Sequence, residues 1–376
     1  MKIETYNLPL VSVIMPIRNE AAFIERSLAA VLAQDYPPDL IEVLVVDGMS
    51  DDGTREIVQR MIYRRHDSAL YGGRNGNGSV LEITNNISPI YLLDNPGRIV
   101  PTGLNSAIRQ ARGEVIVIVG GHAIIERDYV RSCVESLLRT GTDCVGGALD
   151  SIGIGYIGTA IAAAMSSPFG VGSSGFRVAT VGAEPTLTDS VPFPAYRHEV
   201  FKRVGLYNEL MVRHQDYEFN YRLRKAGGKI LLLPSMRVKY YVRSNFRSLW
   251  RQYWQYGLWK GSFLREHPAS LKLRHLIPPL FVLMVAISIL LALIPQARVW
   301  ASWIAPGAYV AFMLAGLIAV SKSGKLRYAP ILPFVFACLH FSYGFGIWLG
   351  LLSPMTSRNN NLTTLKPEDA VNRSHG

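Results

Sequence analysis

Cysteine is scarce in this chain, which has three among 376 residues. Cys133, Cys144 and Cys338 lie far apart and form no Cys-x-x-Cys pair, so the spacings of cysteine metal sites and redox motifs are excluded. We expect reduced, buried thiols. Residues 1–9 are polar and too short for the apolar core of a signal peptide. The sequence therefore predicts that the first domain stays in the cytoplasm.

Acidic residues are also few, with 28 Asp and Glu against 39 Lys and Arg and a net charge of +11. The deficit is greatest in residues 225–274, which carry eleven basic residues and one acid, Glu266. Such a surface binds either nucleic acid or an anionic membrane. Because a long apolar region follows, we favour membrane lipids and expect no nucleic-acid partner.

Charge is absent from three long segments near the C-terminus, residues 276–294, 299–320 and 330–352. Each is long enough to cross a bilayer. We therefore expect a membrane domain of about three helices at 276–352, followed by a polar tail at 353–376. Residues 154–172 are uncharged too, but their Gly and Pro content favours a loop or an interfacial helix over a span.

The links between these segments differ in charge. Lys322, Lys325 and Arg327 lie in the second link, whereas the first carries only Arg298. The positive-inside rule places the basic stretch and the second link in the cytoplasm. His340 lies inside the third segment, where we expect it to hydrogen-bond a neighbouring helix.

Two polar turns follow apolar strands near the N-terminus. Val43-Leu-Val-Val46 predicts a buried strand that ends at Asp47, and Asp52-Gly-Thr54 then opens a helix. Residues 11–15 predict a second buried strand, followed by a polar turn and a helix at 21–32. In a βαβ unit both turns lie on one sheet edge, where open α/β sheets bind ligands. The alternative is that these residues only form turns and helix caps.

These turns carry recognisable motifs. Pro16-x-x-Asn19-Glu20 followed by Val46-Asp47-x-x-Ser50-x-Asp52-Gly-Thr54 resembles the N-terminal signature of family 2 glycosyltransferases. The likeness covers roughly residues 9–265 and is closest to the branch that elongates lipid-linked exopolysaccharide units such as succinoglycan. It continues through Asn95-Pro-Gly-Arg98, Gly103-Leu-Asn105, Ala111-Arg-Gly-Glu114, Val191-Pro-Phe-Pro194, His214-Gln-Asp216 and the segment from Phe219 to Gly228.

The resemblance implies a domain order. Residues 1–245 would form an α/β GT-A domain, which is Rossmann-like with a mixed, mostly parallel sheet. A basic, aromatic interfacial segment would follow at 246–275, before the membrane domain.

The resemblance also implies a nucleotide-sugar site. It places five residues around the nucleotide: Pro16, Asn19, Glu20, Asp47 and Ser50. Arg98 would meet a phosphate, although it could equally be a solvated surface residue. Glu20 could equally serve only to orient its loop.

The implied catalytic base is Asp216, just before a helix at 218–226 that ends at Gly227-Gly228. The alternative is that Asp216 only caps this helix.

The expected metal motif is incomplete. A strand at 115–119 is followed by Gly120-Gly121-His122, where the family carries Asp-x-Asp or Asp-x-His. Mg²⁺ and Mn²⁺ prefer oxygen ligands, usually including carboxylate. We expect a divalent cation with His122 as the ligand from this turn. The alternatives are that cationic side chains replace the metal, or that catalysis is impaired.

The sequence thus predicts a multi-pass protein of the inner (plasma) membrane with a cytoplasmic catalytic domain. It would be an inverting glycosyltransferase that moves a sugar from a nucleotide-sugar donor to a polyprenyl-diphosphate-linked saccharide. A processive polysaccharide synthase is the alternative enzyme, but Gln252-Tyr-Trp-Gln255-Tyr256 lacks the Arg and Trp of the synthase motif Gln-x-x-Arg-Trp. A degenerate nucleotide-sugar-binding membrane protein is the non-enzyme alternative, which Gly120 favours.

Overall fold

The computed structural model describes residues 7–70, 88–172, 174–180, 182–294, 298–321 and 326–353. The chain divides into two compact units. The first comprises Met1–Leu149 and Thr180–Lys239, and the second comprises Asp150–Ala179 and the residues from Tyr240 onward. Residues 150–179, which the sequence grouped with the catalytic domain, thus cluster with the C-terminal helices. The predicted tail beyond Ser353 lies outside the described residues.

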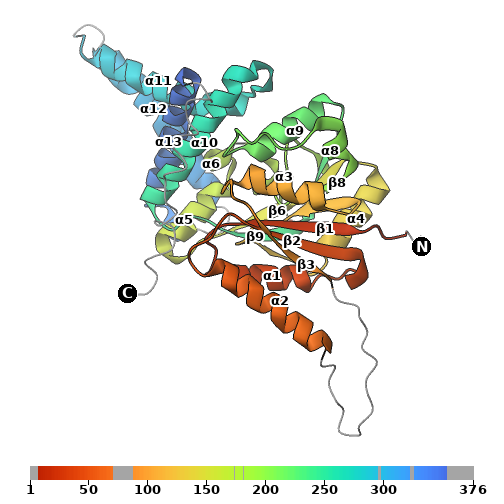
Figure 1. The fold of residues 1–376 in the computed structure, drawn as a ribbon. Helices are drawn as coiled ribbons and strands as arrows, with labels where there is room; N and C mark the ends of the chain where they lie inside the picture. The colour runs from red at the N-terminus through yellow and green to blue at the C-terminus, as the bar shows by residue number, and fades with distance from the viewer. Residues whose placement is uncertain are drawn as a thin grey trace. The chain divides into compact units, whose positions relative to one another are not determined.

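A mixed sheet forms the first unit (Figure 1). Its strands within the described ranges are β1 (Val11–Ile17), β2 (Ile41–Asp47), β3 (Ile90–Asp94), β4 (Val115–Ile118), β5 (Ile124–Ile125), β6 (Cys144–Ile152), β7 (Thr186–Leu187), β8 (Ala195–Arg197) and β9 (Ile230–Tyr241). The order is β3-β2-β1-β4-β8-β6-β9-β5, with β7 paired to β9. Strands β3, β2, β1 and β4 are parallel, and β8 joins β4 antiparallel. Every residue of β2 is buried, as the apolar run predicted.

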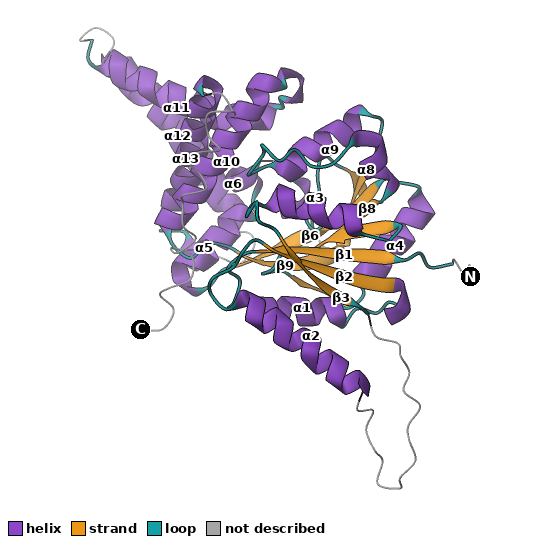
Figure 2. Cartoon of the chain, in the orientation of Figure 1, coloured by secondary structure: helices purple, strands orange, loops and turns teal. Residues whose placement is uncertain are grey.

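Helices cover both faces of this sheet. They are α1 (Ile24–Leu32), α2 (Thr54–Leu70), α3 (Val100–Gln110), α4 (Tyr129–Thr140), α8 (Glu199–Val204) and α9 (Gln215–Lys225). Figure 2 shows α1 and α2 below the sheet and α3, α8 and α9 above it. The strand order reverses between β1 and β4, so their carboxyl ends flank the position where open α/β sheets bind ligands.

A buried polar cluster joins β1 and β2 to the loop before β4. Glu42, which is 1% exposed, accepts hydrogen bonds from Ser12 Oγ at 2.6 Å and from Arg112 Nε at 2.8 Å. Gly113 N donates to Ser12 Oγ at 2.8 Å, and a Cβ at Gly113 would lie 2.4 Å from Ser12 N. The Ala111-Arg-Gly-Glu114 motif therefore includes residues with a structural role.

This cluster makes stability depend on pH. Burial acts to raise the pKa of Glu42, but the hydrogen bonds from Ser12 and Arg112 outweigh it and the pKa is lowered from 4.5. A depressed folded-state pKa contributes stability above the unfolded pKa, and this stability is lost as pH falls through the folded value.

We therefore expect Glu42→Gln to reduce the free energy of unfolding at neutral pH by about 1–3 kcal/mol. The midpoint of thermal unfolding should fall accordingly. The difference from the native protein should shrink as pH falls below 4.5. Thermal melts across a pH series would measure both effects. The matched control is Glu25→Gln, an exposed carboxylate on α1. A difference that stays constant at all pH values would contradict this account.

The second unit is helical. It contains α5 (Gly155–Met165), α6 (Pro168–Val171), α7 (Gly175–Val178), α10 (Phe246–Glu266), α11 (Leu273–Ala292), α12 (Arg298–Ser321) and α13 (Leu332–Leu352). Residues 154–172 form the short helices α5 and α6 rather than a span. Three helices, α11 to α13, cover the three uncharged segments. In the described part of the chain, α11 and α13 are long and apolar enough to cross a membrane.

Glycines bring α10 and α13 into backbone contact. A Cβ on any of four glycines would lie 2.2 to 2.4 Å from a backbone oxygen of the other helix. They are spaced as two Gly-x-x-x-Gly motifs, Gly257 and Gly261 on α10 and Gly346 and Gly350 on α13. Small residues at this spacing let helix backbones approach closely.

The two helices run parallel. Gly257 contacts Tyr343 and Ile347, whereas Gly261, further along α10, contacts Ile347 and Gly350, further along α13. If α13 entered a bilayer, α10 would have to enter beside it, together with its charged residues. More than half of the most apolar stretch of α13 is already buried in the protein, 56% against 17% for α11. Of these two helices, α11 is thus the one whose apolar surface is mostly exposed.

The predicted contact of His340 is confirmed. Its Nε2 lies 2.8 Å from the carbonyl oxygen of Phe169 on α6, so the ring joins α13 to a neighbouring helix.

Candidate active site

The turns after β1 and β2 are tied together by hydrogen bonds. Asn19 N donates to Ser50 Oγ at 2.9 Å, and Asn19 Nδ2 donates to Asp51 Oδ1 at 2.8 Å. Glu20 N donates to Thr54 Oγ1 at 2.8 Å. The two segments that the sequence placed on one sheet edge therefore form a single structure.

Asp47 lies at the end of β2 with its side chain 1% exposed. Ser50 Oγ donates to its Oδ1 at 2.6 Å, and Arg55 Nη1 lies 3.2 Å from its Oδ2. Arg55 also pairs with Asp94 at the end of β3, at 2.7 Å. Pro16 lies on β1 opposite Val46, one position before Asp47. The carboxylate is thus fixed in direction by neighbours from α2 and its own turn.

A second contact joins the turn after β1 to the turn after β4. Glu20 Oε1 lies 2.9 Å from His122 Nδ1, although the two residues are 102 positions apart. The side chains are 20% and 44% exposed, respectively. A Cβ at Gly121 would lie 2.9 Å from Glu20 Cγ, so the glycine gives Glu20 room to reach the imidazole. This pair lies where the strand order reverses.

Strained backbone coincides with the motifs. Within the described residues, the non-glycine residues with positive φ are Asn19 (54°), Met49 (59°), Arg98 (60°), Phe193 (46°) and His214 (60°). Each lies within or beside one of the quoted motifs. Such conformations cost about 1–3 kcal/mol each and persist only where the surroundings impose them, commonly at functional sites. The five turns are therefore held in shape by the fold.

Arg98 and Asp216 are both exposed residues. Arg98 follows β3, and its carbonyl accepts a hydrogen bond from Arg18 at 3.3 Å, which links its turn to the turn after β1. Asp216 lies in the first turn of α9, where the helix dipole favours a carboxylate. The helix begins three residues earlier than predicted, and its N-cap is His214 rather than Asp216. The helix ends at Lys225 with Ala226 as its C-cap, and Gly227 follows with a φ of 80°, as expected for a glycine after a helix.

Comparison with known proteins gives consistent matches. The family model described as Glycosyl transferase family 2 matches residues 12–76. The succinoglycan biosynthesis protein ExoA of Rhizobium meliloti (strain 1021) is 29% identical over 342 residues, which cover 90% of this chain and 94% of that protein. The chain carries a family 2 glycosyltransferase domain. The expected GT-A fold is the fold of its first unit.

Two further proteins resemble this glycosyltransferase. A dolichyl N-acetyl-alpha-D-glucosaminyl phosphate 3-beta-D-2,3-diacetamido-2,3-dideoxy-beta-D-glucuronosyltransferase of Methanococcus voltae is 26% identical, over 89% of this chain and 95% of that protein. The solved mannosyltransferase PcManGT of Pyrobaculum calidifontis aligns with a TM-score of 0.49 and 20% identity, over 93% of this chain and 88% of that chain.

Sequence reasoning missed the supporting residues of the glycosyltransferase site. Arg55 holds Asp47, yet on the sequence it reads as an ordinary first-turn residue of α2. Thr54 belongs to the quoted signature, but its hydrogen bond to the turn of Glu20 was not predicted. Asn105 binds the backbone of Tyr207 in both directions, at 2.9 Å each, and so fixes the segment that leads to His214. The Gly103-Leu-Asn105 motif was the available signal for this contact.

The glycosyltransferase offers few protein ligands for a metal. In the ranges that the structure describes, no group of three or more His, Cys, Asp or Glu is arranged to hold a metal ion. A carboxylate on one imidazole nitrogen is nevertheless how metal-ligating histidines are commonly oriented. The Glu20–His122 pair therefore fits a cation that takes most of its remaining ligands from the substrate.

Proposed function

We propose that the protein transfers one sugar, with inversion, from a nucleotide-sugar to a polyprenyl-phosphate- or polyprenyl-diphosphate-linked saccharide in exopolysaccharide or surface-glycan synthesis. The observation that carries this proposal is the joining of three sheet-edge turns by the Asn19–Ser50 and Glu20–His122 contacts. A lipid-linked acceptor is supported by the name of the Methanococcus relative, whose substrate is a dolichyl phosphate sugar.

In this proposal the residues divide the chemistry between them. Asn19, Asp47 and Ser50, beside Pro16, surround the nucleotide. Arg98 meets the diphosphate. Asp216 takes the proton of the acceptor hydroxyl, whose oxygen bonds to the anomeric carbon as the bond from that carbon to the diphosphate breaks. The nucleoside diphosphate leaves with the electron pair.

A divalent cation, Mg²⁺ or Mn²⁺, would be held by His122 beside Glu20 and would neutralise charge on the leaving diphosphate. The protein's own part is to orient the imidazole through the Glu20 carboxylate.

The function is tested by incubating purified full-length protein with a panel of nucleotide-sugars and a polyprenyl-linked saccharide. We expect one donor to give a product longer by one sugar. A ladder of products would support the processive alternative. Failure of every donor to be transferred or hydrolysed would contradict the proposal.

Restoring the missing carboxylate should strengthen metal binding. A Cβ at Gly120 would lie 3.6 Å from Phe193 Cε1, an ordinary contact, so the site accommodates a side chain. We expect Gly120→Asp to tighten Mn²⁺ binding by about tenfold or more, since it adds a carboxylate ligand. Titration with Mn²⁺, with and without nucleoside diphosphate, measures the change.

The matched control is Gly120→Ala, which adds the same Cβ without a ligand and should leave Mn²⁺ affinity unchanged. A folded Gly120→Asp protein with unaltered metal affinity would remove His122 from the metal site. Metal-independent transfer, with Arg98 or other cations on the diphosphate, would then be the better mechanism.

The proposed location is the inner (plasma) membrane, with the first unit in the cytoplasm and more than one crossing. A reporter fused after Arg298 should read as external, because α11 crosses, and one fused after Lys325 should read as cytoplasmic. Residues 322–325 lie outside the described part of the chain. The opposite pattern would place the transferase unit away from its donor.

A further inference from the structure

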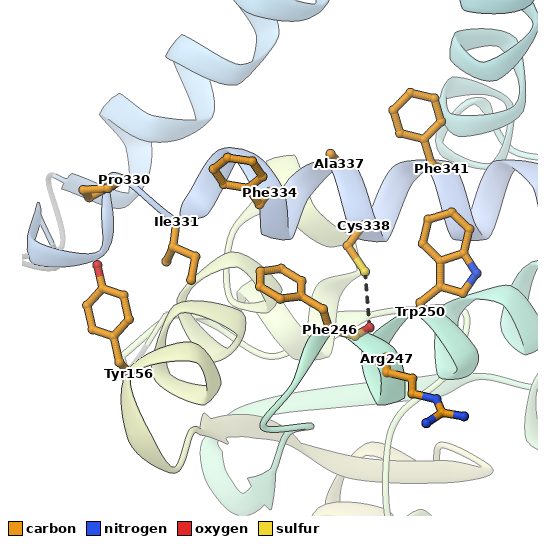
Figure 3. A pocket seen from close by; sticks show the side chains of 10 residues that line it. All are labelled: Tyr156, Phe246, Arg247, Trp250, Pro330, Ile331, Phe334, Ala337, Cys338 and Phe341. Atoms are coloured by element: carbon orange, nitrogen blue, oxygen red, sulfur yellow. Dashed lines mark hydrogen bonds between the residues drawn. The ribbon is translucent and has the colours of Figure 1, made fainter.

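A groove of about 720 Å³ opens in the second unit between the first halves of α10 and α13, with Tyr156 of α5 at one end (Figure 3). This volume lies within the roughly 300–1,000 Å³ of small-molecule pockets. Its walls are almost wholly apolar and rich in aromatic rings, among them Phe246, Trp250 and Phe334.

Residue size along α13 creates the groove. Phe334, Ala337 and Phe341 are spaced three and four residues apart, so they share one face of the helix. Figure 3 shows the short Ala337 between the two phenylalanine rings. On α10, Phe246 and Trp250 are four residues apart and form the facing wall. The rings thus flank an open groove whose floor is a methyl group.

One charged residue, Arg247, belongs to the lining of the groove. It is exposed, and its side chain leaves α10 on the side away from the apolar residues of α13 (Figure 3). Trp250 and Tyr156 are 39% and 43% exposed, and their amphipathic rings suit a membrane interface. The site therefore combines an open apolar groove with one cationic residue in its lining.

We propose that this groove binds the isoprenoid chain of the lipid-linked acceptor, with its phosphate near Arg247; this rests on the proposed function. An amphiphile with an anionic head and an apolar tail matches both parts of the site. Bulk phospholipid can pack against the exposed apolar side chains of α11, such as Leu280, Ile287 and Leu290, and so does not require a groove. The aromatic walls give a branched, unsaturated chain flat surfaces to pack against.

The test uses farnesyl diphosphate carrying a photoreactive group, with the full-length protein in phosphatidylcholine nanodiscs. Mass spectrometry should locate the label on the first halves of α10 and α13. Unlabelled farnesyl diphosphate should compete, and phosphatidylglycerol should not. Ala337→Trp places a large ring in the floor of the groove and should reduce labelling by about tenfold or more. Phe334→Gln changes a side chain that is 67% exposed, so it tests the same wall without threatening the fold, and it should weaken labelling as well.

Two further variants separate the parts of the site. Arg247→Gln should remove the preference for farnesyl diphosphate over farnesol. Leu280→Trp, in a second apolar pocket of about 210 Å³, is the matched control and should label as the native protein does. Normal labelling of both Ala337→Trp and Phe334→Gln would overturn the proposal, as would equal competition by phosphatidylglycerol.

Donor hydrolysis, in which water replaces the acceptor, distinguishes this proposal from the function on which it rests. Groove variants that hydrolyse donor normally but lose labelling support the groove. A native protein that labels in the groove but neither hydrolyses nor transfers any sugar contradicts the proposed function alone.

Discussion

Replacing Asp216 with asparagine should lower the rate of sugar transfer by about two orders of magnitude or more, with donor binding retained. Asparagine has nearly the same size and keeps an oxygen that can accept hydrogen bonds, but it cannot take a proton at neutral pH. Asp216 is exposed in the first turn of α9, so the change leaves no buried group unpaired. Transfer kinetics and nucleotide binding on the same preparation would measure the two effects.

Glu199→Gln is the matched control, because Glu199 is also an exposed carboxylate in the first turn of a helix. It should transfer sugar at the native rate. Asp47→Ala should behave differently again, by weakening nucleotide binding. Normal transfer by Asp216→Asn would mean that another residue is the base.

Replacing Gly346 with leucine should prevent the second unit from assembling. A Cβ at this position would lie 2.4 Å from the carbonyl oxygen of Trp254 and 2.9 Å from Leu258 N. Backbone atoms cannot move aside as a flexible side chain can, so we expect a cost of about 3 kcal/mol or more, the upper end for overpacking. The yield of folded protein in detergent and its unfolding midpoint would report the loss.

Gly307→Leu is the control for this change. Gly307 lies on the apolar helix α12, where a new Cβ meets nothing within 4 Å among the described atoms. This variant should fold and melt as the native protein does. If Gly346→Leu also melts normally, α10 and α13 are not packed as described.

Local sequence predicted the parts of the site that are local in structure. The strand at 43–46 and its turn at Asp47 were predictable because an apolar run meets Asp, Gly and Ser, and β2 confirms it. The start of α9 was misplaced because His214 adopts a left-handed conformation, which is uncommon for any non-glycine residue.

The long-range contacts that shape the site could not be predicted from the sequence. The Glu20–His122 pair joins residues 102 positions apart, and only the strand order brings their turns together. The glycines of α10 and α13 read as weak points in helices when taken alone. Their role is visible only when the two helices are seen side by side.

The pairing of α10 with α13 also affects how the protein is made. The ribosome synthesises α10 first and then α11 and α12. The glycine face of α10 therefore has no partner until α13 has left the ribosome. Until then Gly257 and Gly261 present bare backbone to solvent, to lipid or to a chaperone. A chain that stops before Leu332 would never cover this face. Completion of the second unit therefore waits for the synthesis of α13, and until then the glycine face of α10 is open to wrong contacts.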